Sequence, residues 1–368
     1  MNTQTPLYAV HERAGASFTD FAGYDMPLRY SSDLAEHHAV RERAGMFDLS
    51  HMAEIAVTGS EAAAFLDFAL SNRLSALSVG QAKYSLLLSD QGGVLDDLIV
   101  YRLEDSDFLV VANAANRHVA FEALVERSAG FAVEVADTSD EWALIAVQGP
   151  KARAIVDASG MLCESPLDEL GYYRIAVGTF HSETLYIART GYTGEDGYEL
   201  FVPQALAPAL WDDLEAAGAE HGMVLCGLAC RDTLRLEAGM PLYGHELDRD
   251  HTPAQAGLGR VVDSSKEDFV GKDAGAHPEE GVPVLVGLQA EGKRAPRAGY
   301  AVVTPEGEHI GTVTSGALSP TLGYPIAMAY VDPAHAAPGT EIAVDVRGSL
   351  LRVTVSALPF YSRKKVTP

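Results

Sequence analysis

The residues from 281 to the C-terminus differ in pattern from the rest of the chain, and this difference constrains the fold most. They form short segments of alternating apolar and polar residues, separated by Gly, Pro and Asp: "VPVLVGLQAEG", "GYAVVTPEGEHIGTVTSG", "YPIAMAYVD" and "EIAVDVRGSLLRVTVSALPFY". Such segments are typical of β-strands joined by turns. We therefore expect residues 281–368 to form an all-β domain, a small barrel or sandwich, with "GKDAGAHPEEG" as the linker before it.

Residues 1–275 mix strand and helix patterns. The strand pattern "HMAEIAVTG" precedes the helical pattern "SEAAAFLDFALSN", for which Ser60 is the expected N-cap. The same succession of apolar strand, glycine turn and helix recurs in "EWALIAVQGPKARAIVDASG". A further short helix is expected in "SSDLAEHHAVRERAG", closing at Gly45. Two strand–glycine–helix units predict duplicated α/β halves.

The charge of the chain excludes several classes of function. Its 368 residues include 51 acidic and 27 basic side chains, for a net charge of −24. Such a surface repels nucleic acids and anionic lipids, so a site for an anionic small molecule must supply a locally placed Arg or Lys. No apolar run of 18 residues is present and the first residues carry no signal-peptide pattern, so we expect a cytoplasmic protein without a membrane span.

The three cysteines, Cys163, Cys226 and Cys230, do not form a disulfide framework. Cys226 and Cys230 lie four residues apart in "CGLAC" and could share one helical face. A metal site needs more ligands than this spacing offers, so we interpret them as buried free thiols.

The segment "GGVLDDLIVY", residues 92–101, places two carboxylates side by side in a predicted buried strand. Because successive side chains on a strand point to opposite faces, Asp97 and Tyr101 share one face and Asp96 lies on the other. An inward-facing carboxylate without a partner is costly to bury, so it needs a partner or a function.

The segment "RTGYTGEDGYELFVP", residues 189–203, contains three glycines at 191, 194 and 197, which predict a turn where the backbone closely approaches another group. A strand follows, with Tyr198 and Glu199 on opposite faces. The alternative interpretation is a glycine-rich hairpin with exposed acidic residues. A phosphate-binding loop is excluded, because the sequence contains no G-x-x-x-x-G-K-[ST] motif.

The segment "GLACRDTLRLEAGMPLYGHE" has helical spacing, with Arg231 near the start of the helix, where an anionic group would be stabilised. The alternative is a solvated helix face on which Asp232, Arg231 and Arg235 pair at the surface. The basic end of the chain, Arg363, Lys364 and Lys365, is either a solubilising tail or a docking element.

Nucleophilic catalysis and nicotinamide binding lack their motifs, and His37, His38 and His51 lack metal-ligand spacing, so packed or surface histidines are the favoured interpretation. The remaining polar set suits a flat heteroaromatic ligand with an acidic tail, through ring stacking, carboxylate acceptors and an arginine. This set is Asp97, Tyr84, Tyr101, Tyr192, Glu199 and Arg231.

The chain resembles the T-protein family of the glycine cleavage system. The resemblance runs from Thr5 to about Arg363 and rests on blocks that occur in the family's order: "FAGYDMPLRY", "GMFDLSHM", "GGVLDDLIVY", "RTGYTGEDGYEL", "RDTLRLEAGMPLYGHE" and "GTVTSGALSPTLGYPIAMAYV". It implies an α+β multidomain cloverleaf, with two interleaved α/β subdomains in residues 1–275 and a C-terminal β-barrel-like domain in residues 281–368. It also implies transfer of an aminomethyl carbon from the lipoyl arm of H-protein to tetrahydrofolate, releasing ammonia and 5,10-methylenetetrahydrofolate.

The resemblance also assigns roles to single residues. Asp97 corresponds to the family's key carboxylate, Glu199 to its pterin-edge contact with Tyr192 beside it, and Arg231 to its folate-site arginine. Further implied folate-lining residues are Tyr84, Tyr101, Val111 and Asn113, and Arg363 is expected to meet the folate tail or the H-protein arm. Tetrahydrofolate acts as a co-substrate, no metal or covalent enzyme intermediate is implied, and we expect a monomer.

Two departures and two rival functions accompany this resemblance. Tyr24 stands where the family usually has tryptophan, and Arg260 stands where an aromatic residue is common. The same fold serves folate-dependent demethylases, which lack the H-protein docking surface. It also serves accessory factors for iron–sulfur cluster assembly, whose cysteine motif is absent from "GMPLYGHE".

Overall fold

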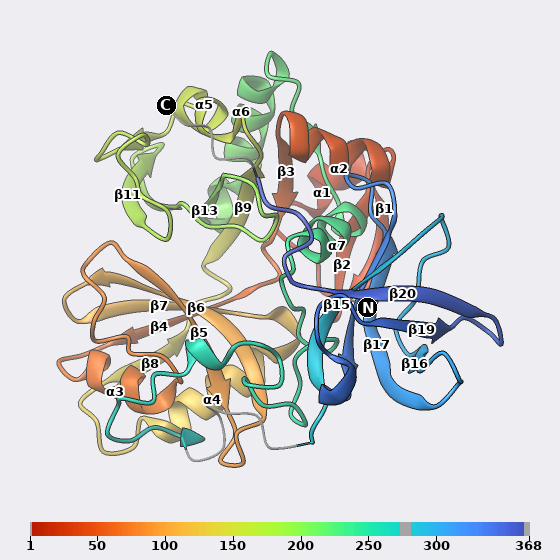
Figure 1. The fold of residues 1–368 in the computed structure, drawn as a ribbon. Helices are drawn as coiled ribbons and strands as arrows, with labels where there is room; N and C mark the ends of the chain where they lie inside the picture. The colour runs from red at the N-terminus through yellow and green to blue at the C-terminus, as the bar shows by residue number, and fades with distance from the viewer. Residues whose placement is uncertain (1, 273–280, 364–368) are drawn as a thin grey trace. The chain divides into compact units, whose positions relative to one another are not determined.

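The computed structural model describes residues 2–272 and 281–363 (Figure 1). The chain divides into two compact units: the first contains residues 1–85 and 97–231, and the second contains residues 86–96 and 232–368. No helix within the described ranges is long and apolar enough to cross a membrane.

The first unit contains most of the helices and most of two large sheets, while β5 (Ala82–Leu88), β6 (Val94–Glu104) and α7 (Leu228–Glu237) have residues in both units. The sheets have the strand orders β10-β11-β12-β13-β9-β3-β14 and β5-β6-β7-β4-β8, and a hairpin of β1 and β2 stands apart from them. The strands are β1 Ser17–Phe21, β2 Tyr24–Arg29, β3 Gly45–Asp48, β4 Ala53–Thr58, β5 Ala82–Leu88, β6 Val94–Glu104, β7 Asp107–Ala112, β8 Glu134–Asp137, β9 Trp142–Gln148, β10 Leu162–Cys163, β11 Ile175–Phe180, β12 Glu183–Ala188, β13 Gly197–Pro203 and β14 Val224–Leu225. The helices are α1 Tyr8–Arg13, α2 Asp33–Glu42, α3 Ala62–Ala69, α4 Arg117–Arg127, α5 Ala152–Ala158, α6 Ala207–Ala219 and α7 Leu228–Glu237, with short 3₁₀ turns η1 Ala114–Asn116 and η2 Gln204–Leu206.

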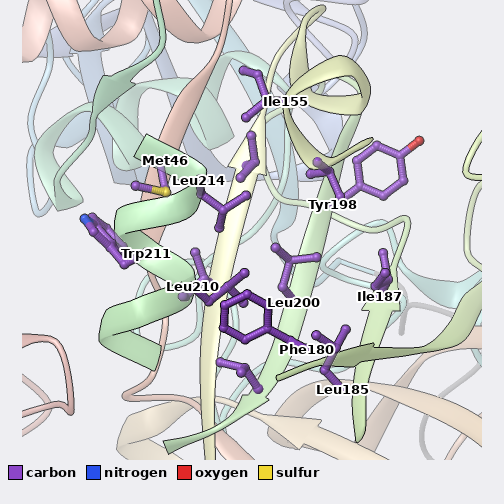
Figure 2. Packing of buried hydrophobic residues seen from close by; sticks show 14 of the residues in the cluster. Met46, Ile155, Phe180, Leu185, Ile187, Tyr198, Leu200, Leu210, Trp211 and Leu214 are labelled. Carbon is purple, nitrogen blue, oxygen red and sulfur yellow. The ribbon is translucent and has the colours of Figure 1, made fainter. Parts of the chain in front are cut away.

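The seven-stranded sheet buries one face under α5 and α6. Leu210, Trp211 and Leu214 of α6 pack in one buried cluster with Leu200 of β13, as Figure 2 shows. Burial of each such side chain stabilises the fold by about 1.5–3 kcal/mol. Glu199 lies on the opposite face of β13, because successive residues of a strand point to opposite faces.

The two predicted strand–glycine–helix units are both present and have matching turns. Gly59 between β4 and α3 has φ +128°, and Gly149 between β9 and α5 has φ +127°. A Cβ atom at either position would lie within 2.6 Å of a backbone oxygen, that of Ala132 or of Arg43. Both turns therefore require glycine, for the same conformational and steric reasons.

The second unit contains the C-terminal barrel. Six antiparallel strands close in the order β15-β18-β17-β16-β19-β20, and apolar side chains fill the interior. The strands are β15 Val284–Ala290, β16 Ala301–Val303, β17 His309–Leu318, β18 Pro325–Val331, β19 Glu341–Asp345 and β20 Leu350–Ser356, with 3₁₀ turns η3 Gly259–Val261 and η4 Pro333–His335. The predicted fold class, mixed α and β with a C-terminal β-barrel, is confirmed. Most of the predicted linker falls on residues 273–280, outside the described residues.

Two predicted helix boundaries are wrong. The helix α2 ends at Glu42, and Gly45 instead opens β3, where a Cβ would lie 2.5 Å from the Cys226 sulfur. Gly45 is thus required for close packing and not for ending a helix. The N-cap of α3 is Glu61 and not Ser60, because the tight turn at Gly59 delays the first helical residue.

The interpretation of the α7 segment as a solvated face is also wrong. Arg235 is only 1% exposed and forms ion pairs of 2.8 Å with Glu246 and Asp232, while its second terminal nitrogen donates to Ser315. Cys226 precedes α7, so the two cysteines do not share one helical face. The cysteines are free, as predicted, and Cys226 and Cys230 are buried.

Candidate active site

Asp97 lies at the centre of a small group of side chains at one end of the five-stranded sheet. The Tyr84 hydroxyl of β5 donates to Oδ2 of Asp97 at 2.9 Å. The Asn113 amide, directly after β7, donates to Oδ1 at 2.8 Å and to the Asp97 carbonyl at 2.9 Å. Three adjacent strands therefore fix the orientation of one carboxylate.

The Asp97 carboxylate has neutral hydrogen-bond donors but no cationic partner. In the part of the chain that the structure describes, Asp97 forms no ion pair. Burial raises the pKa of Asp97 above its ordinary value, and the hydrogen bonds from Tyr84 and Asn113 act in the opposite direction. The result is a carboxylate whose negative charge is not compensated by the protein.

The alternation predicted for β6 is present. Burial alternates along the strand from Val94 to Ile99, with Asp96 fully buried and Asp97 partly exposed. Within the second unit, burial raises the pKa of Tyr243, and the charge of Asp96 adds to this shift. The two carboxylates are thus in different environments, as their opposite faces require.

Glu199 is linked to Tyr101 through a hydroxyl relay that joins the two sheets of the first unit. Thr190 donates a short hydrogen bond to Glu199, and the Tyr101 hydroxyl lies 3.0 Å from the Thr190 oxygen. Burial raises the pKa of Glu199, while the hydrogen bond from Thr190 and the charge of Arg231 act to lower it. Glu199 is 9% exposed, so the alternative of a hairpin with exposed acidic residues does not hold here.

The glycine-rich turn before β13 is held by Gln148, which explains its glycines. A Cβ at Gly191 or Gly197 would lie 2.1 or 2.3 Å from the Gln148 side chain. The Gln148 amide donates to the Thr190 carbonyl and accepts from the Thr193 hydroxyl. The predicted close backbone approach is therefore confirmed, and it is to a glutamine of β9.

Arg231 lies in the first turns of α7, with its guanidinium carbon 5.0 Å from the centre of the Tyr192 ring. Burial lowers the pKa of Arg231, and the charge of Glu199 opposes this shift. Within the described ranges Arg231 makes no ion pair. A half-buried cation without a bound carboxylate suits an anionic ligand.

The other predicted residues lie in different parts of the chain. Val111 is the cross-strand partner of Ile99, on the face that carries Asp97, and Tyr101 is buried with its hydroxyl directed at Thr190. Arg363 belongs to the second unit. Lys364 and Lys365 lie outside the described residues.

Tyr173 is a residue of this region that the sequence reasoning missed. Its backbone is left-handed, with φ +58°, which is uncommon for a bulky side chain and concentrates at functional sites. Its N–H donates to the Arg189 carbonyl, and its own carbonyl accepts from Ala82. Burial raises the pKa of Tyr173, with further contributions from the charges of Glu199 and Asp97. No local motif in "GYYR" signals this conformation.

Two other features do not include the predicted site residues. A surface hollow of about 590 Å³ is lined by Arg174 and by three acidic residues, Glu104, Glu164 and Glu169, whose charges outweigh that of the arginine and disfavour an anionic ligand. Among described residues, Glu36, Cys226 and Cys230 have donor atoms within 4.8 Å of one another. The Glu36 carboxylate already accepts from three backbone N–H groups, those of Tyr30, Ser31 and Gly227.

Two family models together match most of the chain. The GCVT N-terminal domain matches residues 7–266, and the glycine cleavage T-protein C-terminal barrel domain matches residues 284–362. The chain belongs to the glycine cleavage T-protein family.

Relatives of known name agree with this T-protein assignment. The chain is 58% identical over 367 residues to an aminomethyltransferase of Cutibacterium acnes, with 98% of each chain covered. It is 57% identical to an aminomethyltransferase of Streptomyces coelicolor, again with 98% of each covered. The crystal structure of the glycine cleavage system aminomethyltransferase T from Bartonella henselae superimposes with a TM-score of 0.90 at 39% identity, covering 98% of both chains.

Proposed function

We propose that this T-protein is the aminomethyltransferase of the glycine cleavage system. It transfers the one-carbon unit from the aminomethyl-lipoyl arm of H-protein to tetrahydrofolate, forming 5,10-methylenetetrahydrofolate and releasing ammonia. The observation that carries the proposal is the uncompensated carboxylate of Asp97, held by the neutral donors Tyr84 and Asn113. A fixed negative charge of this kind is suited to a cationic carbon.

The chemistry needs such a charge at one step. The lone pair of the aminomethyl nitrogen forms a C=N bond as the C–S bond breaks, and the bonding electrons and then a proton go to sulfur. The carbon–nitrogen centre is now cationic, and the Asp97 carboxylate stabilises it and orients the folate amine that attacks. Closure by the second folate amine expels ammonia, and the reaction requires no metal.

The folate contacts follow from the charges of the site. Glu199 accepts from the N–H groups of the pterin edge, and Arg231, without an ion pair of its own, binds a carboxylate of the folate tail. Tyr84, Tyr101, Tyr192, Val111 and Asn113 form the wall around the ligand. Arg363 meets the folate tail or the H-protein arm. The assignments in the first unit rest on the matching motifs and on its geometry, whereas that of Arg363 rests on its place in the sequence alone.

The proposed setting is the cytoplasm, in keeping with three free cysteines, and the proposed working unit is a monomer, since a single chain supplies these side chains. The proposed domains are a folate-binding region, residues 1–275, and a barrel domain, residues 281–368.

The decisive experiment is an assay of ammonia release from aminomethylated H-protein, with and without tetrahydrofolate. We expect strong folate-dependent release by the wild-type protein. Binding of folate without any release would refute the transferase proposal. The same protein would then be assayed with N-methyl and sulfonium donors, which the related demethylases use.

A further inference from the structure

His51 is a buried histidine to which the mechanism above gives no function. It lies in the connection between β3 and β4 and is 2% exposed. Its Nδ1 atom is buried and has no hydrogen-bond partner among the residues that the structure describes. Buried polar atoms are nearly always hydrogen-bonded, so an unpartnered one points to a missing ligand or water.

The surroundings of His51 place it beside the candidate site. The rings of Phe21 and Tyr24, from the β1–β2 hairpin, lie edge-on at 5.4 and 6.4 Å from the imidazole. Ala53, two residues further on, pairs with Ala112 of β7, so the His51 connection leaves the sheet at the end where Asn113 holds Asp97.

The imidazole of His51 remains uncharged. Burial is the main reason that the pKa of His51 is lowered to about 4; the charge of Asp48 opposes this shift and the charge of Arg231 adds to it. A neutral imidazole has one nitrogen that accepts a hydrogen bond. His51 therefore offers an uncharged hydrogen-bond acceptor at the same end of the sheet as Asp97.

We propose that His51 binds the nitrogen of the aminomethyl group, accepting a hydrogen bond from its N–H. This inference rests on the proposed function, and it assigns the amine subsite of the same reaction. The amine must be neutral to expel sulfur, because a protonated nitrogen has no lone pair to give. A neutral acceptor binds the amine without protonating it.

Other N–H donors of the two substrates fit this position less well. The pterin edge has donors, but Glu199 is the buried acceptor proposed for it. The folate tail carries carboxylates, which accept hydrogen bonds and gain nothing from an acceptor.

The test compares two substitutions at His51 in the full-length protein with aminomethylated H-protein. His51→Leu fills the volume but removes the acceptor, whereas His51→Asn keeps a polar oxygen close to the position of Nδ1. We expect His51→Leu to lower kcat by about 30-fold, since a lost buried hydrogen bond to a reacting group has this order of effect. We expect His51→Asn to stay within about 5-fold of the wild-type kcat, and both to bind tetrahydrofolate within about 2-fold.

Three outcomes would overturn the inference. A kcat of His51→Leu close to wild type would mean that Nδ1 holds only a water. A loss confined to the Kd for tetrahydrofolate would place the contact on folate, and equal losses in both variants would indicate packing alone. Trp211→Phe is the matched control, because it removes another buried, unpartnered nitrogen of the first unit, and it should leave kcat unchanged.

A measurement on the wild-type protein covers the case in which the variants do not fold. The ¹⁵N resonance of the His51 imidazole should shift when aminomethylated H-protein is added and should not shift with unmodified H-protein. Equal shifts with both forms would contradict the inference. Failure of the proposed function has a different signature, the absence of folate-dependent ammonia release from the wild-type protein itself.

Discussion

The Tyr84 hydroxyl donates a hydrogen bond of 2.9 Å to Oδ2 of Asp97. Tyr84 is one of the proposed ligand-wall residues, and Asp97 is the proposed catalytic carboxylate. Since this hydrogen bond favours the ionised carboxylate, it opposes the effect of burial on the pKa of Asp97. Tyr84 therefore tunes the charge state of Asp97 in addition to fixing its orientation.

Tyr84→Phe should move the acidic limb of the kcat–pH profile to higher pH. The reaction uses the ionised carboxylate, so activity is lost as pH falls through the pKa of Asp97. Removing the Tyr84 donor raises that pKa further, and the loss then begins at a higher pH. Ammonia release measured across the acidic range checks this, with Tyr101→Phe as a control whose hydroxyl contacts Thr190 instead. An unmoved acidic limb in Tyr84→Phe would show that the bond does not tune Asp97.

Asp97→Asn should bind tetrahydrofolate within a few-fold of wild type but lose most of its turnover. The amide keeps the shape of the side chain but cannot supply the negative charge, and losing one electrostatic contact to a transition state costs about 100-fold or more in kcat. Titration of tetrahydrofolate and single-turnover ammonia release separate the two effects. Near-normal turnover would remove Asp97 from the mechanism.

Arg231→Ala should weaken tetrahydrofolate binding by at least about tenfold, the order expected when a charge-assisted hydrogen bond is lost. Arg231→Lys should restore binding only in part, because an ammonium cannot reproduce the planar guanidinium beside Tyr192. Equilibrium titration measures both. Unchanged affinity in the alanine variant would place the folate tail elsewhere.

Glu246→Leu should destabilise the protein by about 3–5 kcal/mol, because it leaves the buried guanidinium of Arg235 without its buried partner. Urea unfolding followed by circular dichroism gives the change in the free energy of unfolding. The control is Asp212→Leu, which breaks an exposed ion pair with Arg13 and should cost less than about 1 kcal/mol. Equal losses in the free energy of unfolding for Glu246→Leu and Asp212→Leu would contradict the expectation that the buried ion pair contributes more than the exposed one.

Much of this architecture was predictable from local pattern. The period of two along "GGVLDDLIVY" separated Asp97 from Asp96, and the short alternating segments after residue 281 predicted the barrel. Both patterns depend on one strand and its immediate neighbours. The family motifs also indicated single candidate site residues, and the roles of those residues remain predictions.

Features that depend on distant segments were not predictable. The spacing of Asp232 and Arg235 indicated a surface pair, but Glu246 and Ser315 close over the arginine from later in the chain. In the same way, no local pattern specifies the left-handed backbone of Tyr173 or the unpartnered nitrogen of His51, because both result from what packs around them.

The hydrogen-bonded chain from Tyr101 through Thr190 to Glu199 couples folate binding to the docking of the two sheets. Its members come from both sheets of the first unit, so the proposed folate contacts exist only while the two sheets are docked. Any opening that parts the sheets releases the ligand, and by mass action bound tetrahydrofolate must suppress such openings. Folate should therefore slow amide hydrogen exchange in β6 and β13 together, which makes substrate supply a determinant of how long the enzyme stays folded.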